Sequence, residues 1–546
     1  MDLLLYPTPR SLTRLPGTVP ADAPLRRVLD PVISGDEAYR LSIRDGAITL
    51  TARTATGLCW ADATLAQIRA QHATALPCLV IDDAPAFAHR SFMLDISRDR
   101  VPTLKTLMQL VDLLASLKGN RLQLYTEHTL AYRGHEDAWR GTSALTLEEL
   151  AALDAYAATK GVALDANQNC LGHVERWLKH PRYAPLGESS EGRMHNGNWY
   201  VEPNTLCPED PGSFALVEDL LRQQLPVVSG AYANIGCDEP WDLGFGRSKA
   251  ACDMEGRGKV FSRWVSKVAA LTHKLGKKPQ YWCDPHPNED DGLPRDLIAL
   301  VWGYNHDEDF VTRVTAHRAA GRTVWVAPGI GGWNSATGRT WCRRGNLAKA
   351  AAQAGTAEGF LLTEWGDNGH HQPWPTTLVG VADGMQAAWS GSDHFDDAAL
   401  GQAVFGDPAA GRWFCALGNA DEQLSRQAGN GNATIQDLGY HYADPAGMGT
   451  TEQWSATGAR LDHLLAEIPP GWWAEEGAFG ARFARWAVDR AVARRSGGFP
   501  SGAVRCDLAV RMCSLIATHR RQWLARCGAG GLEDSCNRLR RHTIHY

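Results

Sequence analysis

Residues 231–241, Ala-Tyr-Ala-Asn-Ile-Gly-Cys-Asp-Glu-Pro-Trp, hold the pattern that decides the fold. A short, mostly apolar run is followed at once by a glycine and two carboxylates, as expected where a buried strand of a parallel sheet ends. From Arg90 to Trp389, runs of this kind alternate with stretches of helical periodicity. This alternation predicts a series of βα units and a parallel sheet.

The number of apolar runs decides between an open sheet and a closed barrel. We predict eight strands, at residues 92–95, 121–125, 161–165, 231–236, 279–284, 297–302, 323–327 and 359–363. Predicted helices lie between them, at residues 103–117, from 146 onward, at 214–225 and at 259–275. The helix after Thr146 begins with a capping box that Glu149 completes. Eight strands with intervening helices favour a (β/α)8 TIM barrel over a doubly wound sheet.

The sequence on either side of the barrel predicts two further domains. Residues 1–86 form a small α+β domain, in which 47–52 alternates like a strand and 56–71 has the period of an amphipathic helix. The barrel occupies residues 87–395. Residues 396–546 are rich in Ala, Arg and Leu, show helical periodicity and predict a helical C-terminal domain.

Composition excludes several classes of partner. The net charge is -6, with 55 basic and 61 acidic residues, so we expect neither nucleic acid nor an anionic membrane as a partner. The 13 cysteines include no C-x-x-C pair, which argues against a zinc site. The first seven residues lack the basic start and the apolar length of a signal peptide, and this predicts a cytoplasmic protein.

Adjacent carboxylates follow the fourth predicted strand. Active sites of TIM barrels lie at the C-terminal ends of the strands, where Asp238 and Glu239 are expected. Hydrolysis of a glycoside needs an acid that protonates the leaving oxygen and a second group that stabilises the oxocarbenium-like centre. The alternative is that the two residues only cap the segment after them.

The segment Gly236-Cys237-Asp238-Glu239 resembles the Gly-x-Asp-Glu signature of glycoside hydrolase family 20, the β-N-acetylhexosaminidases. Four other segments resemble the family in the same order: residues 89–98 its first barrel strand, 168–173 its Gly-His loop, 363–367 its Trp-plus-acid segment and 388–390 its last pocket tryptophan. The resemblance covers about residues 1–395. Ser91 in place of glycine, Glu127-His128 after the second strand and Asp367 in place of glutamate indicate a divergent subgroup.

The resemblance implies an exo-acting enzyme that removes terminal β-linked GlcNAc or GalNAc and retains the anomeric configuration. The substrate's own 2-acetamido oxygen attacks the anomeric carbon. Asp238 would hold the acetamido N–H and stabilise the oxazolinium ion, and Glu239 would act as general acid and then as base. The resemblance implies neither a metal nor a cofactor, and the sequence does not separate GlcNAc from GalNAc.

The remaining expected site residues contact the sugar. Arg90 would donate to the sugar hydroxyls, Asp367 would accept from those at the far edge of the ring, and Tyr304 would align the acetamido carbonyl. His173 would support the acidic pair, and Glu127 would contact the sugar or the leaving group, or belong to a supporting network. Four tryptophans near strand ends would wall the pocket: Trp302, Trp333, Trp365 and Trp389.

Two other functions fit the same residues. One is a conventional glycosidase that pairs Glu239 with Glu127 or Glu364 and acts on sugars without an acetamido group. The other is a catalytically silent glycan-binding protein. In each case the ligand is an oligosaccharide or a small glycoside, and the C-terminal domain is a candidate interface for a homo-oligomer.

Overall fold

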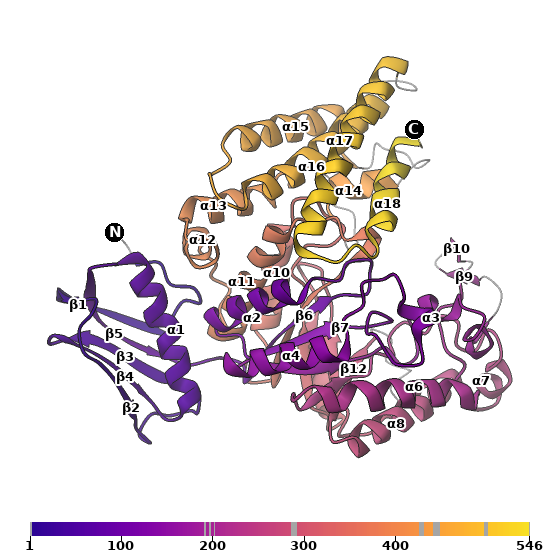
Figure 1. Ribbon diagram of the computed structural model, residues 1–546, viewed down its shortest axis with the longest axis horizontal. Coiled ribbons are helices and arrows are strands. Elements are labelled where there is room, and N and C mark those ends of the chain that lie inside the picture. The colour runs from indigo at the N-terminus through magenta and orange to yellow at the C-terminus, as the bar shows by residue number, and fades with distance from the viewer. Residues whose placement is uncertain are drawn as a thin grey trace.

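The computed structural model describes residues 3–189, 193–195, 198–200, 202–284, 292–424, 431–439, 448–495 and 501–544. It has three parts, which Figure 1 shows in chain order from the indigo N-terminal sheet, through the barrel, to the yellow helices at the C-terminus. The N-terminal and C-terminal parts both pack against the barrel.

The N-terminal part is a five-stranded sheet with one helix on its face, as the sequence predicts. Its elements are β1 (Ser11–Pro20), β2 (Leu25–Leu29), β3 (Tyr39–Arg44), β4 (Ala47–Ala52), α1 (Ala55–Gln71) and β5 (Ala75–Asp83). The strand order is β1-β5-β3-β4-β2. Side chains of β4 alternate between partly and fully buried, because α1 covers one face of the sheet.

The central part is a closed parallel barrel of eight strands, which confirms the predicted fold. The strands are β6 (His89–Asp95), β7 (Arg121–Tyr125), β8 (Ala163–Asn167), β11 (Tyr232–Asn234), β12 (Lys278–Cys283), β13 (Ile298–Trp302), β14 (Val324–Ala327) and β15 (Gly359–Glu364). Each lies within three residues of a predicted strand at both ends. The barrel closes where β11 pairs with β8 and β15 pairs with β6.

Helices surround the barrel. The longer ones are α2 (Leu104–Ser116), α4 (Leu147–Thr159), α6 (Pro211–Gln224), α8 (Arg257–Lys274), α9 (Phe310–Ala319), α10 (Thr340–Ala351) and α11 (Trp374–Ser390). The capping box predicted at Thr146 and Glu149 starts α4. Between β12 and β13 the described residues contain no helix.

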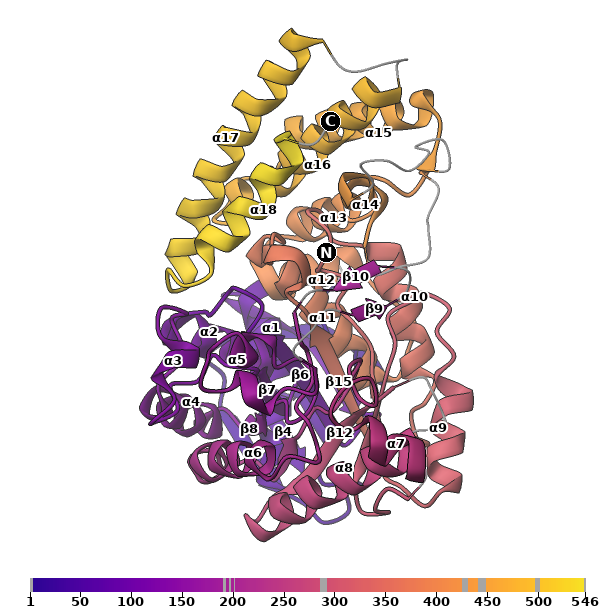
Figure 2. The ribbon, with the colours of Figure 1, turned by 90° about the vertical axis from the view of Figure 1, so that its right-hand side faces the viewer.

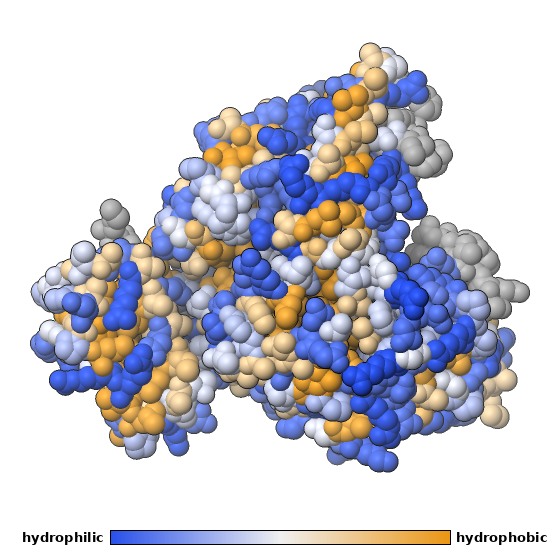
Figure 3. Space-filling model, viewed as in Figure 1, coloured by the Kyte–Doolittle hydropathy of each residue, from blue (hydrophilic) through white to orange (hydrophobic). Residues whose placement is uncertain are grey.

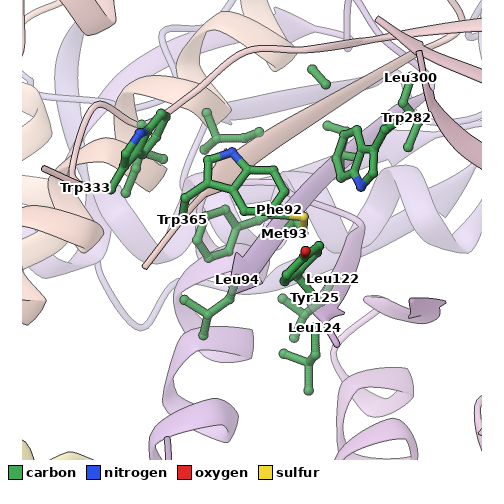
Figure 4. Packing of buried hydrophobic residues seen from close by; sticks show 14 of the residues in the cluster. Phe92, Met93, Leu94, Leu122, Leu124, Tyr125, Trp282, Leu300, Trp333 and Trp365 are labelled. Carbon is green, nitrogen blue, oxygen red and sulfur yellow. The ribbon is translucent and has the colours of Figure 1, made fainter. Parts of the chain in front are cut away.

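Aromatic side chains close the barrel interior at the C-terminal ends of the strands. Figure 4 shows Tyr125, Trp282 and Trp365 converging there, next to the aliphatic and Phe side chains of β6 and β7. The ring centroids of Tyr125 and Trp365 are 4.7 Å apart, and those of Trp282 and Trp365 are 5.7 Å apart. This layer separates the core from the polar loops above it.

The C-terminal part is helical, as predicted. Its helices are α12 (Asp397–Phe405), α13 (Pro408–Leu417), α14 (Ala433–Gly439), α15 (Thr451–Ala466), α16 (Ala474–Arg495), α17 (Gly502–Arg526) and α18 (Leu532–Ile544). In Figure 2, α17 and α18 run side by side: α17 descends to the turn between them, and α18 rises from it. Apolar residues are visible along α17 in Figure 3. Val510 of this helix is 61% exposed. Among the described helices, none is both long enough and apolar enough to cross a membrane.

Candidate active site

A small pocket lies above the aromatic layer, at the C-terminal ends of the barrel strands. Its volume is about 100 Å³. Nine residues line it: Arg98, His173, Asp238, Glu239, Trp282, Trp302, Tyr304, Trp365 and Asp367. All of them lie near the end of a strand or in the loop after it, so the pocket stands where parallel barrels build their active sites. The structure thus brings seven of the eleven expected residues into one pocket.

The acidic pair enters the pocket from a tight turn after β11. Cys237 and Glu239 have positive φ angles of 70° and 44°, which non-glycine residues rarely adopt. The turn is held by the Glu239 N–H, which donates to Asp284 Oδ2 at 2.8 Å. Gly172 packs against the same backbone, and a Cβ there would lie only 2.2 Å from the carbonyl oxygen of Asp238. A strained backbone that neighbouring residues hold in place, as Asp284 and Gly172 do here, is typical of functional sites.

His173 bridges the two carboxylates. Its Nε2 lies 3.3 Å from Asp238 Oδ2 and 3.4 Å from Glu239 Oε2. Burial by itself would lower the pKa of this imidazole, but the charge of Asp238 and the hydrogen bonds to both carboxylates raise the pKa well above its ordinary value. The positive imidazolium is therefore the favoured form between the two acids.

Arg98 presents a guanidinium to the pocket beside His173, with its Nη2 3.4 Å from His173 Nδ1. It lies above the rings of Tyr125 and Trp365, with its Cζ 4.9 and 5.0 Å from their centroids. Its nitrogens are 3.1 Å from Asp95 and 3.9 Å from Asp367. Asp95 also accepts from the Gly366 N–H at 2.9 Å, so the loops after β6 and β15 are tied together at this arginine.

Glu127 lies beside the pocket and does not line it. Its carboxylate is 3.5 Å from Arg98 and accepts from Tyr125 Oη at 2.9 Å. Burial raises the pKa of Glu127 to about 7, against the opposing charge of Arg98. In this position Glu127 contacts Arg98 and Tyr125, as expected for the second of its two predicted roles, a member of a supporting network.

Aromatic rings form one wall of the pocket. Trp302 stacks on Tyr304 with centroids 5.5 Å apart, and Trp365 Nε1 donates to Tyr304 Oη at 2.8 Å. Trp282 lines the pocket as well, although the sequence analysis did not select it. Its position near the end of the fifth predicted strand was the signal that could have identified it. Trp333 is fully buried and does not line the pocket. Its ring packs behind Tyr304, and the two ring centroids are 5.0 Å apart.

Arg90 and Trp389 lie at the other end of the barrel, which corrects their expected placement. The Arg90 guanidinium pairs with Glu37 and donates to the carbonyl of Lys118, and it lies 5.0 Å from the Trp389 ring centroid. Trp389 Nε1 donates to Asp83 at 3.0 Å. Both side chains therefore join the barrel to the N-terminal sheet.

The chain direction explains both corrections. Arg90 is the second residue of β6, and at about 3.3 Å per residue the strand carries the chain across the barrel before it reaches Asp95. The loop beyond that end contains Arg98, which is the arginine that lines the pocket. Helix α11 runs back from the pocket side, so Trp389 at its end returns to the N-terminal ends of the strands.

Glu364 is also outside the pocket lining. It is fully buried, and its Oε1 accepts from Thr377 Oγ1 at 2.6 Å and from Gln372 Nε2 at 3.1 Å. These contacts point the carboxylate away from Glu239 and toward α11. They argue against a catalytic pair formed by Glu239 and Glu364.

Comparisons with known proteins bear on the same parts of the chain. Residues 87–328 match the model of the glycosyl hydrolase family 20 catalytic domain, and residues 11–84 match that of domain 2 of the same family. A β-hexosaminidase of Akkermansia muciniphila is 26% identical over 289 residues, which are 46% of this chain and 57% of that protein. A β-N-acetylhexosaminidase of Cellulomonas fimi is 26% identical over 320 residues, which are 56% of this chain and 60% of that protein. The chain thus spans less than two thirds of these relatives.

Solved structures share the fold at lower identity. The chitobiase of Flavobacterium johnsoniae is 16% identical with a TM-score of 0.62, and the alignment covers 99% of each chain. An exo β-N-acetylglucosaminidase of Vibrio harveyi is 17% identical with a TM-score of 0.58, over 72% of this chain and 74% of that one. Two models of this one family match adjacent parts of the chain, which together make up more than half of its length, so the chain belongs to glycosyl hydrolase family 20.

Proposed function

We propose that this protein is an exo-acting β-N-acetylhexosaminidase that removes terminal β-linked GlcNAc or GalNAc by a retaining, substrate-assisted mechanism. The observation that carries the proposal is the side chain of Asp238. Its Oδ2 faces His173, while its Oδ1 is buried and has no hydrogen-bond partner among the described residues. A buried carboxylate oxygen needs a donor, and the acetamido N–H of a bound sugar supplies one.

The reaction would proceed in two steps. In the first, the acetamido oxygen bonds to the anomeric carbon while the bond to the leaving oxygen breaks and Glu239 transfers its proton to that oxygen. Asp238 stabilises the positive oxazolinium through the N–H. In the second, Glu239 takes a proton from water, whose oxygen attacks the anomeric carbon and reopens the ring, so the configuration is retained.

Tyr304 is suited to align the acetamido carbonyl. Its hydroxyl already accepts a hydrogen bond from Trp365, which leaves its own proton to be donated. Burial raises the pKa of Tyr304, so the hydroxyl stays protonated and acts as a neutral donor. The indoles of Trp282, Trp302 and Trp365 supply apolar faces for the acetamido methyl group and for the sugar ring.

Arg98 and Asp367 would hold the hydroxyls at the far edge of the sugar. The guanidinium offers a fork of donors, and the carboxylate 3.9 Å away accepts. Because Arg98 is also bound by Asp95 and lies over the rings of Tyr125 and Trp365, its position is set before the sugar arrives.

Hydrolysis of aryl glycosides tests the proposal. We expect turnover of aryl 2-acetamido-2-deoxy-β-glucosides or β-galactosides, none of their 2-hydroxy analogues, and loss of turnover in Asp238→Asn and Glu239→Gln. The exposed Asp253→Asn serves as the matched control and should keep full activity. Turnover of the 2-hydroxy glycosides would favour the conventional two-carboxylate glycosidase. Sugar binding without turnover of any substrate would favour the silent glycan-binding protein.

A further inference from the structure

A larger groove lies directly outside the pocket. Its volume is about 780 Å³, and it shares Arg98, His173, Glu239 and Asp367 with the pocket, so the two form one continuous space. A single sugar ring in the pocket would leave the groove free. Glu239 would protonate the leaving oxygen and also lines the groove, so the leaving group of a bound substrate extends into it.

One wall of the groove comes from the C-terminal domain. The residues of α18 that line it are Asp534, Asn537, Arg538 and Arg541. Their spacing of three, four and seven residues from Asp534 places them on a single face of the helix. Arg540 does not line the groove itself, but it donates to Asn537 Oδ1 at 2.6 Å from behind the groove wall. The helix therefore presents one polar face to the substrate side of the barrel, where Figures 1 and 2 show it lying above the strands.

Helix α18 is fixed against the two loops that carry pocket residues. Gly531, just before the helix, packs so closely on the backbone of Asp99 that a Cβ would lie 2.0 Å from its carbonyl oxygen. Ser535 Oγ donates to the carbonyl of Gly369, and Arg538 Nε lies 3.5 Å from Asp99 Oδ2. Asp99 directly follows Arg98, and Gly369 lies two residues after Asp367. The wall therefore keeps a defined position relative to the pocket.

The groove lining is polar and carries both signs of charge. The cations Arg176, Lys179, Arg538 and Arg541 stand among the carboxylates Asp99, Glu175, Glu202 and Asp534. Trp241 adds one aromatic ring beside His173, with centroids 5.8 Å apart. Mixed donors and acceptors around an aromatic face suit a neutral, hydroxyl-rich ligand better than an apolar or a strongly charged one.

We propose that the C-terminal domain completes the substrate site, and that the α18 face binds the second sugar of an oligosaccharide, on the leaving-group side of the cleaved bond. This inference rests on the proposed function, because the substrate of an exo-acting enzyme has its remaining sugars only on the leaving-group side. Asn537 and Arg541 donate to the hydroxyls of this second sugar. The domain thus makes the enzyme selective for oligosaccharides over glycosides with small leaving groups.

The double variant Asn537→Ala/Arg541→Ala tests the inference. We compare kcat/KM for a β-linked chitotriose with kcat/KM for the 4-nitrophenyl glycoside of the same acetamido sugar. Loss of hydrogen bonds to one sugar should lower the ratio of kcat/KM for chitotriose to kcat/KM for the 4-nitrophenyl glycoside about tenfold. Arg521→Ala removes one positive charge from the neighbouring helix α17, where Arg521 is exposed, pairs with Glu475 and lies outside the groove lining, so it should leave the ratio at its wild-type value.

An unchanged ratio in the double variant, or an equal fall in Arg521→Ala, overturns the inference. Failure of the proposed function looks different, because the wild type would then hydrolyse neither acetamido substrate. In that event, titration calorimetry with chitotriose still decides the matter. Weaker binding in the double variant than in Arg521→Ala supports the α18 site, and equal binding overturns it.

Discussion

His173 Nε2 stands 3.3 Å from Asp238 Oδ2 and nearly as close to Glu239, so one cation neutralises two neighbouring acids in the pocket. Without it, two carboxylates on consecutive residues would repel each other in a partly buried site. The histidine is held in place by a left-handed backbone conformation, with φ at 56°. The charge of His173 should therefore affect how the stability of the protein depends on pH.

Replacing His173 with glutamine should destabilise the protein most at low pH. A pKa that is raised on folding stabilises the fold below the unfolded value of about 6.5, and this stabilisation is lost as the pH rises through the folded value. We expect His173→Gln to lower the free energy of unfolding by about 1.5–3 kcal/mol near pH 6. In denaturant titrations, the difference in the free energy of unfolding between wild type and variant should become smaller at high pH. A difference that grows with pH would contradict a charged His173.

Replacing Gly172 with alanine should damage catalysis. The new Cβ would collide with the backbone of Asp238, and displacing the acidic pair by about 1 Å should lower kcat about a hundredfold. Gly502→Ala at the start of α17 is the matched control, because nothing lies within 4 Å of its added Cβ. Full activity of Gly172→Ala on an aryl acetamido glycoside would show that the turn tolerates the displacement.

Arg98 and Arg90 should behave differently when each is replaced by alanine. Arg98→Ala removes donors from the pocket, and kcat/KM should fall about a hundredfold. Arg90→Ala leaves Glu37 and a backbone carbonyl without their buried partner, so the free energy of unfolding should fall by about 3–5 kcal/mol while the folded molecules stay active. Kinetics and denaturant titrations on both variants measure this contrast. The reverse pattern would restore Arg90 to the site.

Replacing Glu127 with glutamine should stabilise the protein at neutral and alkaline pH. Burial raises the pKa of Glu127 to about 7, so the folded state resists its ionisation, and this cost grows from about pH 4.5 to pH 7. Glu127→Gln should therefore match the wild type near pH 4.5 and gain about 1–3 kcal/mol above pH 7. Glu148→Gln, on an exposed carboxylate, is the control. A loss of stability above pH 7 would mean that the ion pair with Arg98 outweighs burial.

Much of the fold follows from local patterns. The apolar runs at residues 121–125 and 359–363 form β7 and β15. They could be predicted because an apolar run and the helical stretches beside it are visible in the local sequence. The capping box of α4 is equally local, since Thr146 and Glu149 satisfy each other's backbone groups. The same holds for Asp238 and Glu239, whose place after a strand puts them at the active end of any parallel barrel.

The sequence by itself thus determined the eight-stranded barrel, the helical C-terminal part and the acidic pair. Only the tertiary structure decided that Arg98 and not Arg90 lines the pocket, that Trp389 packs on the N-terminal sheet, and that α18 stands beside Asp367. The reason is physical. Periodicity and capping act over a few residues, whereas the end of the barrel that a side chain occupies depends on contacts such as Trp389 with Asp83, which lie 306 residues apart in the chain.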